Sequence, residues 1–298
     1  MSVPRNQANR NLIKNVLWLV ASFLLLFVLL RTFEYAQVYK PRTDLIAHPG
    51  SIHPEPLDVV LKSGDSYRLH GWFFSATEQN KWSDWVVLIS HGNGGNISYG
   101  LPLCRVWLEE GFNVMAYDYR GYGQSSGRPS EEGTYEDVTQ FYQWLLSRGF
   151  DPKRIIAVGE SLGGAVATDL ATRKTLGGLV IQNSFTRITD IGKELFPWLP
   201  IETFGTIRYD TQSKLPGLQL PKMILHSRED SLVAFHHAEK NFADSREPKY
   251  LGETEGDHND GVVAIERLYR HHVNEFKKLL REFHSTPNPP TLKQRESK

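Results

Sequence analysis

The chain has 298 residues, of which 40% are hydrophobic, so it can fill the core of one large domain or of two modest ones. Its 34 basic and 34 acidic residues balance, which gives no indication of a nucleic-acid partner. The single cysteine, Cys104, excludes an intrachain disulfide framework and is expected to be a buried thiol, because it lies in an apolar helical pattern.

A long apolar segment follows a basic N-terminal tail at residues 1–12. Sixteen uncharged residues separate Lys14 from Arg31. As a helix they would span about 24 Å at ~1.5 Å per residue, a little less than a hydrocarbon core of roughly 30 Å, but the two flanking basic side chains can snorkel. We therefore predict a transmembrane anchor at residues 13–33. A cleaved signal peptide is the alternative, and it is disfavoured because no small-x-small cleavage site follows the segment.

The charges that flank this segment indicate an orientation. Arg5, Arg10 and Lys14 precede it, whereas the basic residues that follow it are partly offset by Glu34 and Asp44. Under the positive-inside rule this asymmetry favours a cytoplasmic N-terminus. The protein would then be a single-pass membrane protein whose globular part lies outside the cytoplasm.

Beyond the anchor, four prolines interrupt residues 34–56, and we predict a linker there. Strand patterns then alternate with helical patterns over residues 57–284. This alternation predicts an α/β fold with a mostly parallel sheet, helices on both faces, and chemistry at the carboxyl ends of the strands. A hairpin is expected at its start. The expected strands are 58–61, 67–74, 85–90, 112–117, 155–158, 178–182, 222–226 and 250–254, and the expected helices lie near 98–110, 138–146, 164–171, 231–242 and 265–283.

Two stretches fall outside this alternation. Residues 183–220 separate two strands by more than the roughly 12–15 residues expected of a structureless loop, and they contain several large apolar side chains. We predict one or two short helices there, forming a small cap over the mouth of the site; a peripheral insertion is the alternative. The tail at residues 285–298 is polar and rich in proline, and it is expected to be disordered.

A Gly-x-Ser-x-Gly motif at residues 159–163 comes directly after one strand and before a helix of small residues. This order is typical of a nucleophile elbow, a strained turn that exposes a serine hydroxyl, and side chains in place of the two glycines would collide with the neighbouring strand and helix. A second match at residues 123–127 runs into a loop rich in breakers rather than into a helix. We predict that Ser161 is the nucleophile and that Ser125 is not.

A serine nucleophile needs a base, and the base needs an orienting acid, in the chain order Ser, then Asp or Glu, then His. Asp230 follows the strand at 222–226 and is the predicted acid, with Glu229 as the second choice; a helix N-cap is the other interpretation of Asp230. His258 lies in a Gly/Asp/Asn loop after the last strand and is the predicted base. The competing histidines fall on predicted helices.

A tetrahedral intermediate needs two N–H donors. We predict that they are the backbone N–H groups of Leu162, directly after the nucleophile, and of Asn93, in the glycine-rich loop 91–96. That loop does not match a phosphate-binding pattern, and no Cys/His cluster has metal-ligand spacing. Neither a cofactor nor a metal is therefore expected.

The segments 91–96, 118–127 and 159–164 together resemble the α/β-hydrolase family, in particular its membrane-anchored abhydrolase-domain proteins and serine-aminopeptidase-type hydrolases. The resemblance covers about residues 57–283. It implies the α/β-hydrolase fold and a Ser-His-Asp triad, and it implies that segment 118–127 is structural. It does not specify a substrate, because that branch includes lysophospholipases, acyl-thioesterases and other esterases.

These observations favour a membrane-anchored serine hydrolase that cleaves carboxylic esters or thioesters through an acyl-enzyme. Its substrates would be small molecules or lipids that carry an acyl chain. A serine peptidase of the same fold and a catalytically silent binding protein with a hydrolase fold are the alternatives.

Overall fold

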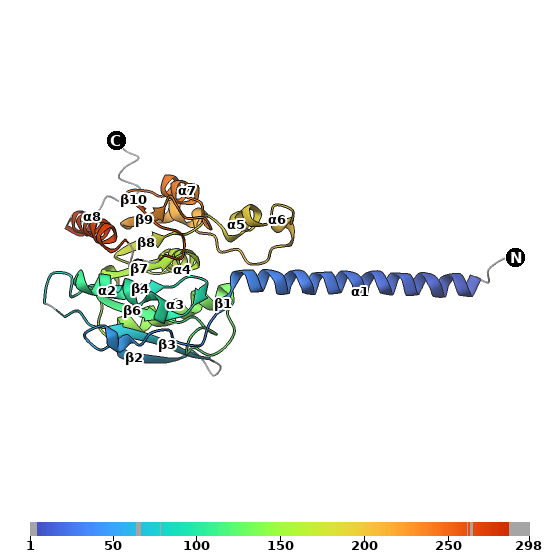
Figure 1. Ribbon diagram of the computed structural model, residues 1–298, viewed down its shortest axis with the longest axis horizontal. Helices are drawn as coiled ribbons and strands as arrows, with labels where there is room; N and C mark the ends of the chain where they lie inside the picture. Colours follow the sequence, from blue (N-terminus) through green and yellow to red (C-terminus); the bar gives the residue numbers. More distant parts are fainter. Residues whose placement is uncertain (1–4, 64–66, 78, 261, 263–264, 286–298) are drawn as a thin grey trace.

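The computed structural model describes residues 5–63, 67–77, 79–260, 262 and 265–285 (Figure 1). Its central element is an eight-stranded sheet with the strand order β10-β9-β8-β7-β4-β6-β3-β2. The strands from β10 to β6 run parallel, whereas β3 and β2 are antiparallel to their neighbours and form the predicted hairpin. The predicted mostly parallel sheet is therefore confirmed. The strands are β2 (Leu57–Ser63), β3 (Tyr67–Phe74), β4 (Val86–Ser90), β6 (Asn113–Tyr117), β7 (Ile155–Glu160), β8 (Gly178–Gln182), β9 (Lys222–Ser227) and β10 (Lys249–Thr254).

Helices cover both faces of this sheet because the central strands are apolar on both sides. On β4, Val87 and Ile89 pack with α2 and α8, whereas Val86 and Leu88 belong to the cluster under α3, α4 and α7. Successive side chains of a strand point to opposite faces, so one continuous apolar run serves two cores. The helices are α2 (Leu101–Glu109), α3 (Glu131–Ser147), α4 (Leu162–Arg173), α7 (His236–Asp244) and α8 (Glu266–Ser285), with short 3₁₀ turns at Pro49–Ser51, Ile97–Gly100, Pro152–Arg154 and Gln212–Gly217.

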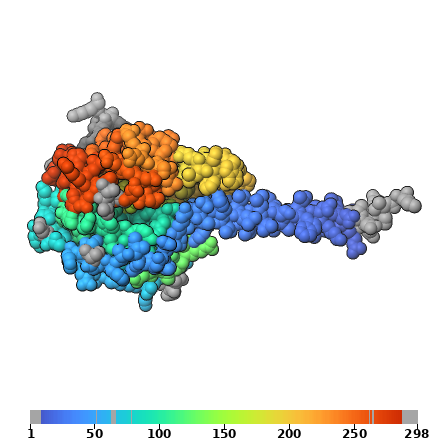
Figure 2. Space-filling view, in the orientation of Figure 1, coloured from blue at the N-terminus to red at the C-terminus, as the bar shows by residue number. Residues whose placement is uncertain are grey.

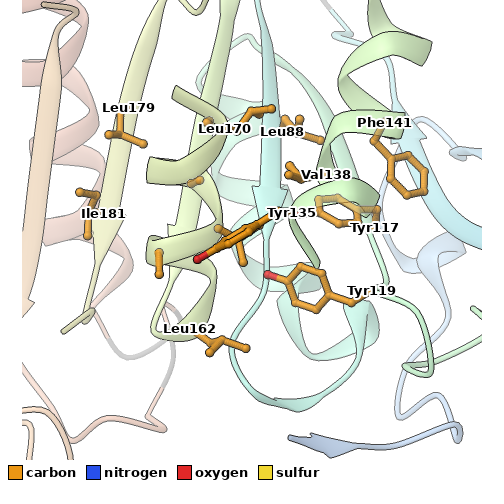
Figure 3. Close-up of a cluster of buried hydrophobic side chains, with 14 of the residues drawn as sticks. Leu88, Tyr117, Tyr119, Tyr135, Val138, Phe141, Leu162, Leu170, Leu179 and Ile181 are labelled. Atoms are coloured by element: carbon orange, nitrogen blue, oxygen red, sulfur yellow. The ribbon is translucent and has the colours of Figure 1, made fainter. Parts of the chain in front are cut away.

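The core under α3 and α4 is rich in aromatic rings (Figure 3). Tyr117 at the end of β6 stacks on Phe141 of α3 with ring centroids 4.7 Å apart, and Tyr119 meets Tyr117 edge-on at 5.4 Å. Offset and edge-on pairs of this kind contribute beyond the area they bury. They hold the carboxyl end of β6 against the helices, next to Leu162 at the start of α4.

Helix α1 (Arg5–Val38) projects away from the sheet as a single continuous helix (Figures 1 and 2). Its stretch Asn9–Val38 is long and apolar enough to cross a membrane by length and composition. The helix extends beyond the predicted anchor at residues 13–33 in both directions, because it already includes residues 5–12 and runs through residue 38. No proline interrupts it until Pro41, so nothing in the backbone ends the helix at residue 33.

Residues of the predicted linker at 34–56 pack against the globular body. Tyr39 and Ile52 are buried in the two cores. The short strand β1 (Lys40–Pro41) pairs in parallel with β5 (Gly94–Gly95). The prolines interrupt the periodicity, but they do not prevent the apolar residues between them from being buried.

The insertion between β8 and β9, residues 183–220, contains α5 (Ile188–Leu195), α6 (Ile201–Phe204) and the last 3₁₀ turn. Figure 1 shows α5 and α6 on the side of the body from which α1 projects. Phe196, just after α5, meets Phe33 of α1 edge-on, with ring centroids 5.3 Å apart. Residues 286–298 of the predicted disordered tail lie outside the described residues.

We expect Tyr39 to contribute strongly to stability, because its ring is buried and its hydroxyl lies 3.2 Å from that of Tyr209. Tyr39→Ala should lower the free energy of unfolding by about 3–5 kcal/mol, and Tyr39→Phe by about 1 kcal/mol. Denaturant unfolding of the full chain in detergent measures both, with Lys40→Ala as an exposed control. Equal, negligible effects of Tyr39→Ala and Lys40→Ala would show that this segment is a free linker after all.

Candidate active site

Ser161 sits in the turn between β7 and α4 with φ 52° and ψ −116°, in the left-handed half of backbone space. Three hydrogen bonds hold this unfavourable conformation. The Ser161 N–H donates to the Gln182 carbonyl at 2.9 Å, and its carbonyl accepts from the Gly164 N–H at 3.0 Å and from the Ser184 hydroxyl at 2.7 Å. A strained backbone conformation persists only where several surrounding contacts hold it in place, and such residues are concentrated at functional sites.

The glycines on either side of Ser161 are required by close packing. A Cβ on Gly159 would lie 2.0 Å from the Gly163 carbonyl oxygen, and a Cβ on Gly163 would lie 2.0 Å from the Ser90 carbonyl oxygen. The start of α4 therefore rests directly on the backbone of β4 and β7. This close approach turns the Ser161 side chain outward at the carboxyl end of the sheet.

The structure brings Ser161, His258 and Asp230 into one hydrogen-bonded row. The Ser161 Oγ lies 3.0 Å from His258 Nε2, and His258 Nδ1 lies 2.7 Å from Asp230 Oδ2. An ionised carboxylate can only accept, so Nδ1 carries the proton and Nε2 is left to accept from the serine hydroxyl. All three residues are buried. This arrangement is the one in which a histidine can remove a proton from serine.

The other oxygen of Asp230 bonds to the backbone, but not as the helix N-cap that the sequence offered as an alternative, because Phe235 is the N-cap of α7. Asp230 Oδ1 accepts hydrogen bonds from the backbone N–H groups of Leu232 at 3.0 Å and Val233 at 2.7 Å. Asp230 therefore holds a turn while its other oxygen meets His258. The helix expected near 231–242 consequently begins only at His236, because residues 231–235 belong to this turn.

Neighbouring acids fix the loop that carries His258, and sequence reasoning had not assigned them this role. Asp257 Oδ1 accepts from the Ser231 N–H, the Ser231 hydroxyl and the His258 N–H, each at 2.8 Å. The bonds from Ser231 and His258 lower the pKa of Asp257 to about 2. Glu229, the second choice for the acid, accepts instead from the Gly256 N–H at 2.8 Å. These contacts join segments about 27 residues apart, so no local pattern reveals them.

The two predicted oxyanion donors line the same pocket as Ser161. Leu162 is the first residue of α4, and the first N–H groups of a helix have no partner within it. The loop after β4 approaches from the other side, where a Cβ on Gly92 would lie 3.6 Å from the Ser161 Cβ. The Asn93 carbonyl accepts from the Lys40 N–H at 3.0 Å and from the Tyr122 hydroxyl at 2.9 Å. The residues that follow α1 therefore position this loop.

Ser125, in the second Gly-x-Ser-x-Gly match, is bonded to the backbone. Its Oγ accepts from the His70 N–H and donates to the Asp118 carbonyl, both at 2.9 Å. The Asp118 carboxylate accepts from the Ile97 N–H at 2.8 Å, just beyond the glycine-rich loop. Ser125 and Asp118 thus support the loop that carries Asn93.

A cavity of about 170 Å³ opens beside Ser161. Its walls come from three parts of the chain, namely the body around Ser161, the insertion with α5 and α6, and the end of α1. Most of the lining side chains are apolar, which suits a ligand with a hydrocarbon portion. The apolar lining residues are Leu30, Phe33, Val38, Leu162, Phe185, Ile188, Ile191, Leu195, Phe196, Leu199, Pro200, Ile201, Phe204, Ile207, Leu232 and Val233.

Among the described residues, Glu194, His236 and His237 could hold a metal ion, since their ligand atoms lie within 4.8 Å of one another. No sequence pattern predicts this group, because α5 and α7 supply its members from distant positions. His237 Nδ1 already lies 2.8 Å from the Thr186 hydroxyl, and its Nε2 lies 3.3 Å from Glu194. The group joins the insertion to α7, apart from the row formed by Ser161, His258 and Asp230.

The sheet order, the helices on both faces and the strained turn at Ser161 define an α/β-hydrolase fold. The profile of the serine aminopeptidase family S33 matches residues 82–209. The alpha/beta hydrolase domain-containing protein WAV2 of Arabidopsis thaliana is 33% identical over 72% of this chain and 76% of its own length. This chain belongs to the alpha/beta hydrolase family.

Two further proteins are similar to this chain. The lysophosphatidylserine lipase ABHD12 of Danio rerio is 31% identical over 56% of this chain and 48% of its own length. A solved esterase of Pyrococcus furiosus superposes with a TM-score of 0.65 at 24% identity, covering 81% of this chain and 97% of the esterase. At that identity the esterase supports the fold alone.

Stability should fall on acidification, because burial lowers the pKa values of His91, His226 and His237. Below pH 6.5 the unfolded chain binds more protons than the folded chain, so the free energy of unfolding decreases by on the order of 1 kcal/mol per pH unit for each such histidine. Burial also acts on His70, but Asp118 and Asp58 outweigh it and raise its pKa, so His70 opposes the trend.

Denaturant unfolding between pH 8 and pH 5 measures this dependence. The variant His226→Gln should show a smaller loss of stability over the same range, because its side chain does not titrate and can still donate to the Val233 carbonyl. Stability that is constant or higher at pH 5 would contradict the expectation.

Proposed function

We propose that this protein is a membrane-anchored serine hydrolase that cleaves carboxylic ester or thioester bonds through an acyl-enzyme. The observation that carries the proposal is the row of hydrogen bonds from Ser161 through His258 to Asp230, 3.0 Å and 2.7 Å long, beside an apolar cavity. A serine hydroxyl is a weak nucleophile at neutral pH, and this row supplies the base that it needs.

In the proposed reaction, Ser161 Oγ attacks the carbonyl carbon while its proton passes to His258 Nε2. Asp230 remains ionised and stabilises the resulting imidazolium. The N–H groups of Leu162 and Asn93 stabilise the oxyanion. His258 then gives its proton to the departing alcohol or thiol, and an acyl-enzyme remains. Water then attacks the acyl carbon while His258 takes its proton, and His258 returns that proton to Ser161 Oγ as the acyl–oxygen bond breaks and the acid leaves.

The walls of the cavity favour an acyl chain in the substrate. Each CH₂ group moved from water into such a cavity contributes about 0.8 kcal/mol. The relative from Danio rerio is named a lysophosphatidylserine lipase, which agrees with an acyl-bearing substrate. We therefore propose acyl amphiphiles or lipids as the substrate class, with no cofactor or metal in the reaction.

A serine peptidase is the second candidate, because the matching family profile is described as a serine aminopeptidase. An aminopeptidase needs a carboxylate that receives the ammonium group of a peptide. Glu34, a carboxylate in the cavity wall, already pairs with Arg31 at 2.7 Å. This pairing favours ester hydrolysis over peptide hydrolysis. Comparing the rates of hydrolysis of amino-acid arylamides and of acyl esters discriminates between the two functions.

For the membrane, we propose that residues 13–33 of α1 form a single uncleaved span with the N-terminus in the cytoplasm. The apolar side chains of this stretch are exposed, among them Leu17, Leu19 and Phe23 at 63%, 71% and 65%. A monomeric protein rarely exposes so large an apolar surface to water. The hydrolase domain would then lie on the other side of the membrane.

We expect Ser161→Ala to abolish both hydrolysis of p-nitrophenyl acetate and labelling by a fluorophosphonate, with kcat reduced by about 10⁴–10⁶-fold. Ser125→Ala is the matched control, because it removes the same hydroxyl from the other Gly-x-Ser-x-Gly match, and the folded protein should keep both activities. Labelling that persists in Ser161→Ala and disappears in Ser125→Ala would reverse the assignment.

We expect the full chain to stay in the membrane fraction after washing with high salt and with alkaline carbonate, because its apolar helix has the length of a span. A tag at the N-terminus should remain on the protein, because no cleavage is expected. A chain that begins at residue 30 should be released, with the part of α1 that contacts the body intact. Release of the full chain by carbonate would exclude a span, and loss of the tag would indicate a signal peptide.

A further inference from the structure

The end of α1 forms one wall of the cavity beside Ser161. Leu30, Phe33, Gln37 and Val38 all line the cavity. They recur at positions i, i+3, i+7 and i+8, so they share one face of the helix. Val38 is buried in the same core as Leu162, whereas Leu30 lies at the outer end of the face. The last turns of the apolar helix thus run along the cavity from its mouth to the nucleophile.

The opposite wall of the cavity is bonded to the same helix. Glu34 Oε1 accepts from the N–H groups of Thr206 at 2.6 Å and Ile207 at 3.0 Å, and Glu34 Oε2 accepts from the Thr206 hydroxyl at 2.8 Å. Arg31 donates to Glu34 at 2.7 Å and also to the Phe204 carbonyl. Charge-assisted bonds of this kind are stronger than neutral ones. The insertion with α5 and α6 therefore rests on α1 rather than standing free over the site.

The outer rim of this insertion is apolar and exposed. Leu195, Trp198 and Phe204, which we call the cap rim, are 46%, 73% and 45% exposed. Figure 2 shows the insertion in yellow lying against the body end of α1, with the rest of α1 extending beyond it. Tryptophan is enriched where proteins meet the membrane interface. The cap rim therefore lies where α1 would enter the bilayer.

One cavity, lined mostly by apolar side chains but also by Arg31 and Glu34, consequently connects Ser161 with the end of α1. It begins at Ser161, passes between the end of α1 and the insertion, and reaches Leu30 and Phe204. The next residue outward, Leu29, is 56% exposed and belongs to the predicted span. The mouth of the cavity and the apolar part of α1 are thus continuous along one helix.

We propose that a single acyl chain of a membrane-resident substrate enters this cavity directly from the bilayer, between α1 and the cap rim, and that the end of α1 is part of the acyl-binding site. The proposal rests on the serine-hydrolase function proposed above. A chain that moves from the bilayer into the cavity exchanges one apolar environment for another, so its CH₂ groups are never exposed to water. The reacting carbonyl stops at Ser161, and the polar head stays at the interface.

Two neighbouring leucines of α1 provide a matched test of the wall. Leu30→Trp places a large ring in the cavity wall, whereas Leu29→Trp makes the same change one residue away, outside the cavity lining. Both variants keep the helix apolar. For the full chain in detergent, we expect the ratio of kcat/KM for p-nitrophenyl decanoate to that for p-nitrophenyl acetate to fall at least tenfold in Leu30→Trp and to stay within twofold of wild type in Leu29→Trp.

Vesicles test the route of entry. The full chain is reconstituted in phosphatidylcholine vesicles, and 4-methylumbelliferyl palmitate is added either to the same vesicles or to separate ones. We expect hydrolysis at least tenfold faster when enzyme and ester share a bilayer. Equal rates in the two arrangements would overturn entry from the bilayer, and equal decanoate-to-acetate ratios in the two leucine variants would overturn the role of α1 as a wall.

Ser161→Ala separates these outcomes from a failure of the proposed function. If it removes acetate hydrolysis while the two leucine variants behave alike, then only the acyl path is wrong. If it leaves acetate hydrolysis intact, then the serine-hydrolase function itself is wrong and the acyl path falls with it.

Discussion

The conformation of Ser161 is the constraint on which the rest of the site depends. A residue with a side chain holds φ at 52° only because β8 receives its N–H and because Gly164 and Ser184 hold its carbonyl. That conformation in turn requires α4 to begin directly on the backbone of β4, where only glycine fits at position 163. The sheet and the start of α4 therefore set the position of the Ser161 side chain.

His258 and Asp230 then reach Ser161 through loops that hold one another. Asp230 organises the turn before α7, and Asp257 ties that turn to the loop of His258. Each acid accepts two backbone N–H groups, so hydrogen bonds hold both loops even though neither belongs to a helix or a strand. This mutual support keeps the imidazole between its two neighbours.

Helix α1 connects the site to its surroundings in two ways. Its end contacts the insertion through Glu34 and Arg31, and the strand that follows it bonds to the loop of Asn93 through the Lys40 N–H. A segment that the sequence predicts to be an anchor followed by a linker thus lines the cavity beside Ser161. Movement of α1 relative to the body would change both the acyl path and the proposed oxyanion loop.

Local sequence patterns were sufficient to predict the fold class and several residues of the candidate site. The alternation of strands and helices after the first hairpin predicted the α/β sheet. The order strand, Gly-x-Ser-x-Gly, helix singled out Ser161 over Ser125, because the geometry of such a turn depends on adjacent residues. Asp230 and His258 could be selected because each follows a strand at the expected edge of the sheet. The sequence did not determine the contacts of these residues, because Asp230 could equally have capped a helix. In the structure one oxygen of Asp230 accepts from the backbone of a turn, and the other lies within hydrogen-bond distance of His258.

Only the tertiary structure decided the parts that depend on contacts between distant segments. The bonds of Asp257 and Glu229 to neighbouring loops, the packing of Tyr39 in the core and the docking of residues 204–207 on α1 join positions separated by about 26 to 173 residues. The hydrophobic periodicity of a segment does not indicate which distant segment it contacts. The sequence alone determined the class of fold and the nucleophile motif, because backbone geometry and alternating burial are local. The tertiary structure decided that the apolar helix belongs to the cavity, because a wall exists only where two separate segments meet.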